Sequence, residues 1–117
     1  MMLLIVDDNQ AFRRMITRVV CDLADEIREC ADGAQALAAY RQFHPDLVLM
    51  DIEMQGMDGI TATREITTAF PEARVIVVTG HNDEPLRGAA REAGACGYVL
   101  KENLLAIREM IGNTRKP

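Results

Sequence analysis

Three runs of consecutive apolar residues limit what this chain can fold into more than any other feature of its sequence. The runs are Leu3–Val6, Leu47–Met50 and Val75–Val78. Neighbouring side chains of an extended strand point to opposite faces, so each run is apolar on both faces. Strands of this kind are typical of a parallel sheet that helices cover on both sides. Weaker strand patterns occur at Ile27–Cys30 and Tyr98–Leu100, which brings the predicted number of strands to five.

Helical patterns fill the segments between these strands. The first shows one apolar stripe at three- and four-residue steps in a helix from about Gln10, made of Phe12, Met15, Ile16, Val19, Val20 and Leu23. A second helix, closed by the His44–Pro45 break, is suggested by Ala34, Leu37, Ala38 and Phe43. The later helices are expected from a cap at Asp58 to Phe70, from a cap at Asp83 with Pro85 in its first turn, and from Leu104 to about Gly112.

The alternation of strands and helices predicts a doubly wound α/β fold with right-handed crossovers. For five parallel strands the common order is 2-1-3-4-5. The whole chain, residues 1–117, is expected to form one domain, with 113–117 as the possible start of a linker. Three cysteines, Cys21, Cys30 and Cys96, lie in apolar stretches without metal-ligand spacing, which favours reduced core thiols in a cytoplasmic protein.

Charge and hydropathy argue against two classes of partner. The formal net charge of −5 disfavours direct binding to nucleic acid by this domain. No apolar run has the length of a membrane span, and no signal-peptide pattern precedes Leu3. We therefore expect neither a nucleic-acid nor a membrane partner for this domain.

Polar residues follow four of the five predicted strands. They are Asp7 and Asp8 after the first, Asp51 after the third, Thr79 after the fourth and Lys101 after the fifth. In an open α/β sheet, ligand sites lie at the carboxyl ends of the strands, where the strand order reverses. The five side chains are therefore predicted to converge at one edge of the sheet.

Such a convergence of acids calls for a cation. Two like charges about 5 Å apart repel each other by roughly 3 kcal/mol at an effective dielectric constant of about 20. Carboxylate oxygens suit Mg²⁺, whereas a lysine and a hydroxyl suit the oxygens of a phosphoryl group. Taken singly, Asp8 or Asn9 is a candidate cap of the first helix, Thr79 a partner for loop backbone, and Lys101 a solvated surface residue.

The chain resembles the receiver domain of two-component response regulators over essentially its whole length. The resemblance is carried by Asp7–Asp8, Asp51 with Met54, Met57, Asp58 and Gly59, Thr79–Gly80, Tyr98 with Lys101, and Asp32–Gly33. It implies a flavodoxin-like (βα)5 fold. Glu102 after Lys101, in place of proline, is similar to NarL/LuxR-type receivers and favours a trans peptide. Gln55 also replaces a frequent proline and is expected to loosen the loop after Asp51.

The resemblance also implies a phosphoryl-transfer chemistry. Asp51 is the expected phosphoacceptor, assisted by Lys101 and Thr79. Mg²⁺ (or Mn²⁺) is expected on Asp7, Asp8, Asp51 and the backbone carbonyl of Glu53. The donor is expected to be a sensor histidine kinase or a phosphotransfer protein, because the sequence contains no phosphate-binding glycine loop.

Further roles follow from the same resemblance. Thr79 and Tyr98 are the expected switch residues, and Glu53 and His81 are expected to tune dephosphorylation. A phosphorylation-dependent homodimer is an open possibility, with an apolar centre of Leu86, Ala90, Tyr98 and Met110 and a rim of Arg87 and Arg91.

The protein is expected to act in signalling and not as an enzyme with a substrate of its own. Two alternatives are a phosphorylation-independent docking module and a phosphohydrolase with an aspartyl nucleophile. The first is disfavoured because all five site residues are present. The second is disfavoured because Asp7-Asp8-Asn9 lacks the DxD pattern of such enzymes and the chain has no room for a cap region.

Overall fold

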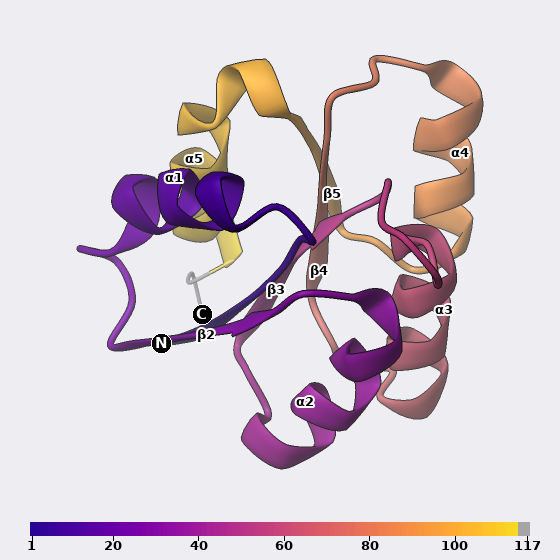
Figure 1. Cartoon of the computed structure of the whole chain (residues 1–117), viewed down its shortest axis with the longest axis horizontal. Coiled ribbons are helices and arrows are strands. Elements are labelled where there is room, and N and C mark those ends of the chain that lie inside the picture. Colours follow the sequence, from indigo (N-terminus) through magenta and orange to yellow (C-terminus); the bar gives the residue numbers. More distant parts are fainter. Residues whose placement is uncertain (115–117) are drawn as a thin grey trace.

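The computed structural model describes residues 1–114, in which five parallel strands form a single sheet (Figure 1). The strands are β1 (Met2–Val6), β2 (Glu26–Cys30), β3 (Leu47–Asp51), β4 (Val75–Thr79) and β5 (Gly97–Leu100). Their order is β2-β1-β3-β4-β5, so the predicted doubly wound topology is confirmed. Strand β2 is added on one side of β1, and β3, β4 and β5 are added on the other, so β1 and β3 lie side by side at the point where the strand order reverses.

The register between the central strands is continuous. Val6 of β1 pairs with Met50 of β3, and Asp51 at the end of β3 pairs with Val78 of β4. Asp7 therefore follows β1 at the level at which Asp51 ends β3. The hydrogen-bond ladder of the sheet thus aligns the two residues along the strands.

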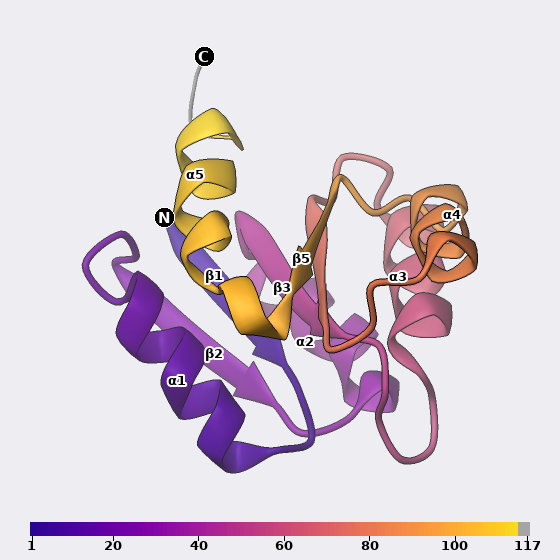
Figure 2. The same cartoon turned by 90° about the horizontal axis from the view of Figure 1, so that it is seen from above.

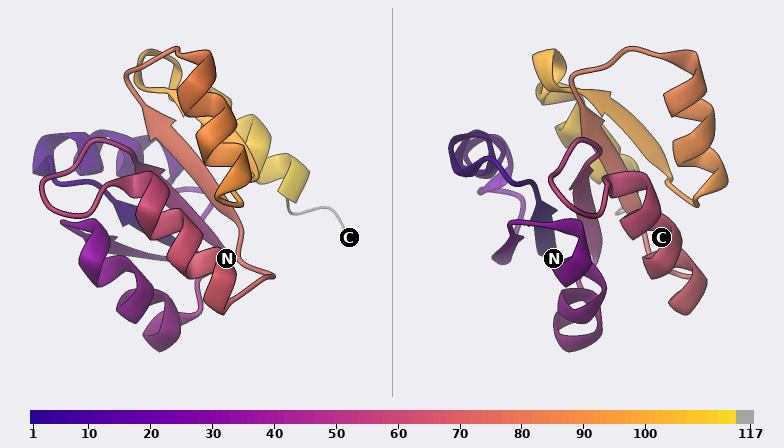
Figure 3. Two further views of the ribbon diagram at one scale, coloured as in Figure 1. Left: turned by 90° about the vertical axis from the view of Figure 1, so that its right-hand side faces the viewer. Right: turned by 45° about the vertical axis from the view of Figure 1, so that its right-hand side comes forward.

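Helices cover both faces of the sheet. They are α1 (Gln10–Val20), α2 (Ala36–Phe43), α3 (Gly59–Ala69), α4 (Glu84–Glu92) and α5 (Leu105–Thr114), with short 3-10 turns at Gly33–Gln35 and Lys101–Asn103. Helices α1 and α5 lie on one face and α2, α3 and α4 on the other (Figures 1 and 2). Figure 3 shows α3 and α4 next to each other on the second face.

The apolar strands divide their side chains between these two faces. Leu3 and Ile5 of β1 pack in the cluster beneath α1 and α5, whereas Leu4 and Val6 pack in the cluster beneath α2 and α3. This alternation explains why the strands are apolar without interruption, since each face is covered. The central strands β1, β3 and β4 are thus buried on both faces, whereas Arg28 and Glu29 of β2 are exposed.

Side-chain caps fix where the helices begin. Asn9, Asp58 and Asp83 each accept a hydrogen bond from the backbone N–H three residues later, which confirms the predicted caps of α3 and α4. The second predicted helix is confirmed as α2, with Leu37 packed on the core. Ala34 precedes the helix and Ala38 is exposed, whereas Ala36 and Tyr40 are buried.

Other boundaries and burials differ from expectation. Met15 keeps 49% of its surface exposed, because it lies at the margin of the α1 stripe. Helix α1 ends at Val20, and Leu23 packs on the core from the following turn. Cys30 is buried, but Cys21 and Cys96 are exposed at the ends of elements, so the prediction of three core thiols is wrong.

At the carboxyl end, α5 continues past Gly112 and includes Asn113 and Thr114. The remainder of the predicted linker start, 115–117, lies outside the described residues. No peptide bond in residues 1–114 is cis, so Lys101–Glu102 is trans as expected. Within the same residues, no helix combines the length and the apolar character needed to cross a bilayer.

Candidate functional site

Three carboxylates meet at the carboxyl ends of β1 and β3. Asp7 and Asp51 are buried, with 2% and 3% of their surfaces exposed, whereas Asp8 is open to solvent. One carboxylate oxygen from each residue lies within 4.8 Å of the others. The predicted convergence of these acids is therefore present in the fold.

The cap of helix α1 is separate from this cluster. The Asn9 side chain accepts a hydrogen bond from the backbone N–H of Phe12 at 2.9 Å. Asp7 Oδ1 accepts one from the Asn9 N–H at 2.8 Å, which tightens the turn between β1 and α1. Because Asn9 caps α1, the Asp8 carboxylate is not used as a helix cap and lies in the cluster with Asp7 and Asp51.

Burial and mutual repulsion disfavour ionisation of Asp51. Burial is the main cause that raises the pKa of Asp51 from 3.8 to about 6, and the charge of Asp7 raises it further. Lys101 opposes both effects, because its Nζ lies 3.3 Å from Asp51 Oδ1 and 3.3 Å from Asp7 Oδ2. One ammonium group thus pairs with two of the three clustered carboxylates. An all-oxygen donor set with excess negative charge fits a hard divalent cation such as Mg²⁺.

The loop after Asp51 passes against the backbone of this residue. The Gly59 N–H donates to the Ile52 carbonyl at 2.9 Å, and a Cβ at Gly59 would lie 1.8 Å from the Asp51 carbonyl oxygen. Only glycine permits this close approach. The glycine of the Asp58–Gly59 pair therefore lets the loop fold back over the end of β3.

Thr79 and His81 border the site from the next strand. Thr79 is buried, and its hydroxyl accepts a hydrogen bond from the His81 backbone N–H at 3.3 Å. The exposed His81 ring is in contact with the Glu53 carboxylate through Nε2 and Oε1. Two loops, one after β3 and one after β4, are thereby joined beside Asp51.

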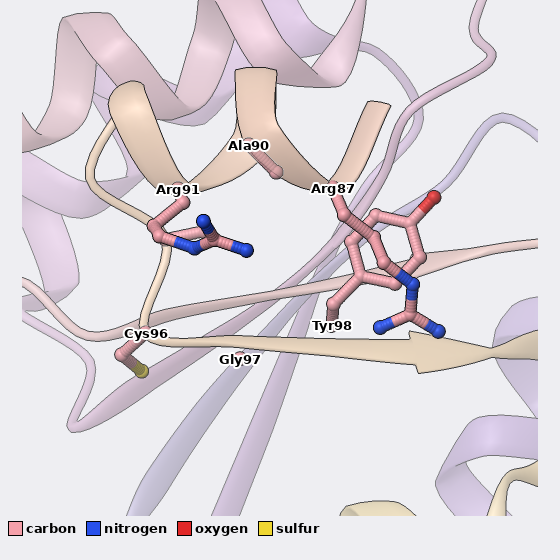
Figure 4. A pocket seen from close by; sticks show the side chains of 7 residues that line it. Arg87, Ala90, Arg91, Cys96, Gly97 and Tyr98 are labelled. Atoms are coloured by element: carbon pink, nitrogen blue, oxygen red, sulfur yellow. The ribbon is translucent and has the colours of Figure 1, made fainter. Parts of the chain in front are cut away.

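Tyr98 ties the same loop to β5 and α4. Its hydroxyl donates to the His81 carbonyl at 2.6 Å, and the Arg87 guanidinium lies 4.5 Å from the centre of its ring. Figure 4 shows Arg87 and Tyr98 at one end of a groove of about 300 Å³ between α4 and β5. Ala90, expected in an exposed apolar centre, is instead only 1% exposed because it packs on the sheet.

These features agree with a family match. The model of the family described as "Response regulator receiver domain" matches residues 3–111. The chain belongs to this family of receiver domains.

Individual relatives of the receiver are also response regulators. The response regulator GacA of Pseudomonas aeruginosa is 34% identical over 96% of this chain and 56% of its own length. The chain thus spans about half the length of that relative. A LuxR-family two-component response regulator from Aurantimonas sp. SI85-9A1 superimposes with a TM-score of 0.84 and 33% identity, over 96% of this chain and 85% of that one.

A second similar structure is the CheX–CheY–BeF3–Mg²⁺ complex from Borrelia burgdorferi. It matches with a TM-score of 0.83 and 25% identity, over 98% of this receiver and 90% of that chain. The receiver fold and the relation to LuxR-type regulators are therefore as expected from the sequence motifs.

Four contacts in and around the receiver site were not predicted from the sequence. Arg13 donates from Nη1 to the Asp7 carbonyl at 2.6 Å and from Nε to Glu29 at 2.7 Å. The Gln55 N–H donates to Asp8 Oδ2 at 3.3 Å, a bond that the expected proline could not make. Lys101 Nζ lies 4.4 Å from the centre of the Phe12 ring. No spacing rule would reveal them, because each joins residues from different elements.

Proposed function

We propose that this receiver is a cytoplasmic phosphoacceptor that takes a phosphoryl group on Asp51 from a sensor histidine kinase or a phosphotransfer protein. The observation that carries the proposal is the buried Asp51 carboxylate, 3.3 Å from Lys101 and clustered with Asp7 and Asp8. The proposal is supported by the similar CheY, whose complex contains BeF3 and Mg²⁺.

The residues that would hold Mg²⁺, or Mn²⁺, are Asp7, Asp8, Asp51 and the Glu53 backbone carbonyl. A divalent cation bound there supplies charge neutralisation for the acids and for the incoming phosphoryl oxygens. The raised pKa of Asp51 supports this assignment, because burial without a cation leaves the carboxylate poorly stabilised. Asp8 is the open member of the set and faces solvent, so it offers the accessible ligand.

In the proposed transfer, an Asp51 oxygen attacks phosphorus in line with the phosphorus–nitrogen bond of a donor phosphohistidine. The new phosphorus–oxygen bond forms as the phosphorus–nitrogen bond breaks, and the imidazole leaves with the electron pair and takes up a proton. Phosphoryl transfer depends mainly on positioning and charge stabilisation. Lys101 would exchange its contact with Asp51 for a phosphoryl oxygen, and the Thr79 hydroxyl would donate to another.

The proposed switch follows from the contacts of Thr79 and Tyr98. When the Thr79 hydroxyl turns to the phosphoryl group, it gives up the hydrogen bond from the His81 N–H. Because Tyr98 holds the carbonyl of His81, the tyrosine and the α4–β5–α5 face respond to the same event. Glu53 and His81, in contact above the acceptor, are proposed to tune dephosphorylation by controlling the approach of water.

The test uses acetyl phosphate with Mg²⁺ and intact-mass spectrometry. We expect a mass gain of one HPO₃ unit that disappears in Asp51→Asn and when EDTA replaces Mg²⁺. Lys101→Met should take up the phosphoryl group far more slowly than the wild type. The matched control is Lys116→Met, which replaces the other lysine of the chain and should react like the wild type. An adduct that persists in Asp51→Asn would contradict the assignment of the acceptor.

Homodimerisation on phosphorylation is the proposed output at the α4–β5–α5 face. Leu86, Tyr98 and Met110 remain partly exposed there, with Arg87 and Arg91 beside them, whereas Ala90 is buried and cannot take part. Sedimentation with and without beryllofluoride, a phosphoryl mimic, should show an increase in mass. An unchanged mass would exclude the homodimer and leave the phosphorylation of Asp51 untouched.

A further inference from the structure

The ammonium group of Lys101 lies between two acids and against an aromatic ring. Its Nζ is 3.3 Å from Asp7 Oδ2 and 3.3 Å from Asp51 Oδ1, so neither carboxylate alone determines its position. A lysine side chain has four flexible bonds and a charge without directional preference. The two acids hold the ammonium between them, but a third contact is required to fix where it lies around the line that joins the two carboxylate oxygens.

Phe12 is the neighbour that meets this requirement. The Lys101 Nζ lies over the face of the Phe12 ring, 4.4 Å from its centre. The face of an aromatic ring carries negative potential and attracts a cation at this distance. The ring gives Lys101 an attractive surface that, unlike a carboxylate, does not change its charge when the phosphoryl group arrives.

The backbone and the core both fix Phe12. Its N–H donates to the Asn9 cap at 2.9 Å, which sets its place in the first turn of α1. Its side chain is half-buried against the core cluster beneath α1 and α5. A connected path thus runs from the end of β1, through the Asn9 cap and the Phe12 ring, to the Lys101 ammonium.

We propose that Phe12 is a positioning residue that holds Lys101 at the midpoint between Asp7 and Asp51, so that its ammonium meets the incoming phosphoryl group. Only the expected effect of Phe12 on the phosphorylation rate rests on the proposed phosphorylation of Asp51. The contact between Phe12 and Lys101 is a separate property of the folded chain and has its own readout.

The first experiment measures the contact by NMR at one fixed pH. The chain contains only two lysines, Lys101 and Lys116, so lysine labelled at the ε-carbon gives two signals. Protons above an aromatic face are shifted upfield by the ring current. We expect the Lys101 ε-methylene protons to be shifted upfield in the wild type and in Phe12→Tyr, and to lose this shift in Phe12→Leu.

The second experiment measures the rate of phosphorylation by acetyl phosphate with Mg²⁺. Phe12→Leu keeps an apolar side chain but lacks the ring face, so the rate should fall roughly three- to tenfold, the factor that a partly exposed cation–π contact supplies. Phe12→Tyr should restore the rate. The matched control is Phe43→Leu. Phe43 lies on α2, and its ring makes a similar contact with the Arg28 guanidinium, 4.6 Å from the ring centre.

Three results would overturn the proposal. One is a Lys101 signal that is the same in the wild type and in Phe12→Leu. Another is a rate in Phe12→Leu within twofold of the wild type, and the third is an equal loss in Phe12→Tyr, since that would indicate packing and not the ring face. If the wild type itself takes up no phosphoryl group, the proposed function fails, while the methylene shift still decides whether Phe12 holds Lys101.

Discussion

Replacement of Asp51 by asparagine is expected to stabilise the metal-free protein at neutral pH. The carboxylate is buried next to Asp7, and its pKa is raised from 3.8 to about 6. An acid whose pKa is higher in the folded than in the unfolded state favours folding only while it is protonated. As the pH rises from about 4 to about 6, the unfolded chain loses this proton before the folded one, and the folded state loses stability.

The size of the effect follows from the shift. A rise of about 2 pKa units, at 1.36 kcal/mol per unit, corresponds to roughly 3 kcal/mol of lost stability at a pH well above 6. Asparagine has nearly the same shape and no charge at any of these pH values. The gain in Asp51→Asn should therefore be near zero at about pH 4 and should reach roughly 3 kcal/mol above about pH 7.

Urea denaturation in the presence of EDTA, repeated across this pH range, measures the gain directly. A saturating Mg²⁺ concentration should stabilise the wild type more than the variant and so reduce the difference at neutral pH. The reasoning is refuted if the gain is the same at acidic and neutral pH, or if the variant is no more stable than the wild type at neutral pH.

Three further changes test other parts of the site. Asp8→Ala should stabilise the metal-free protein slightly and remove its stabilisation by Mg²⁺. In the wild type this stabilisation should reach ~1.4 kcal/mol at a tenfold excess of Mg²⁺ over Kd. A melting temperature that Mg²⁺ raises equally in the wild type and in Asp8→Ala would contradict this. Gly59→Ala should cost about 1–3 kcal/mol in urea denaturation, because its Cβ would lie 1.8 Å from the Asp51 carbonyl oxygen. A Cβ at Gly88 meets nothing within 4 Å, so Gly88→Ala should not destabilise the fold, and similar costs at both glycines would rule out the close approach as the cause. Glu53→Ala and His81→Ala should each change the dephosphorylation rate several-fold while Mg²⁺ affinity is retained, and decay rates within twofold of the wild type for both would show that neither side chain controls the water.

The sequence predicted the sheet and the residues at its edge, because both depend on local patterns. Uninterrupted apolar runs indicate strands covered on both faces, and the polar residues that follow them must lie at the strand ends. Which alanines of α2 are buried could not be predicted, because the small methyl side chain is found both in cores and on surfaces. Ala36 and Ala38 differ in position around the helix but not in chemistry, so only the tertiary packing selects between them.

The contacts that organise the site were outside the reach of sequence patterns. Gln55 was expected to loosen the loop, yet its N–H reaches Asp8 because the loop folds back over β3. Likewise, the contact between Phe12 and Lys101 joins residues from the two ends of the chain. Such contacts depend on the path of loops and on side-chain rotamers, which periodicity does not encode.

The pairing of Val6 with Met50 has a consequence for how this domain can diverge. The spacing of Asp7 and Asp51 along the strands is determined by main-chain hydrogen bonds of the sheet, which do not depend on the outer surfaces of the helices. Substitutions on those surfaces can accumulate without moving one acid relative to the other. Substitutions that alter the recognition surfaces of this domain therefore need not alter the spacing of Asp7 and Asp51, on which the proposed phosphoryl transfer depends.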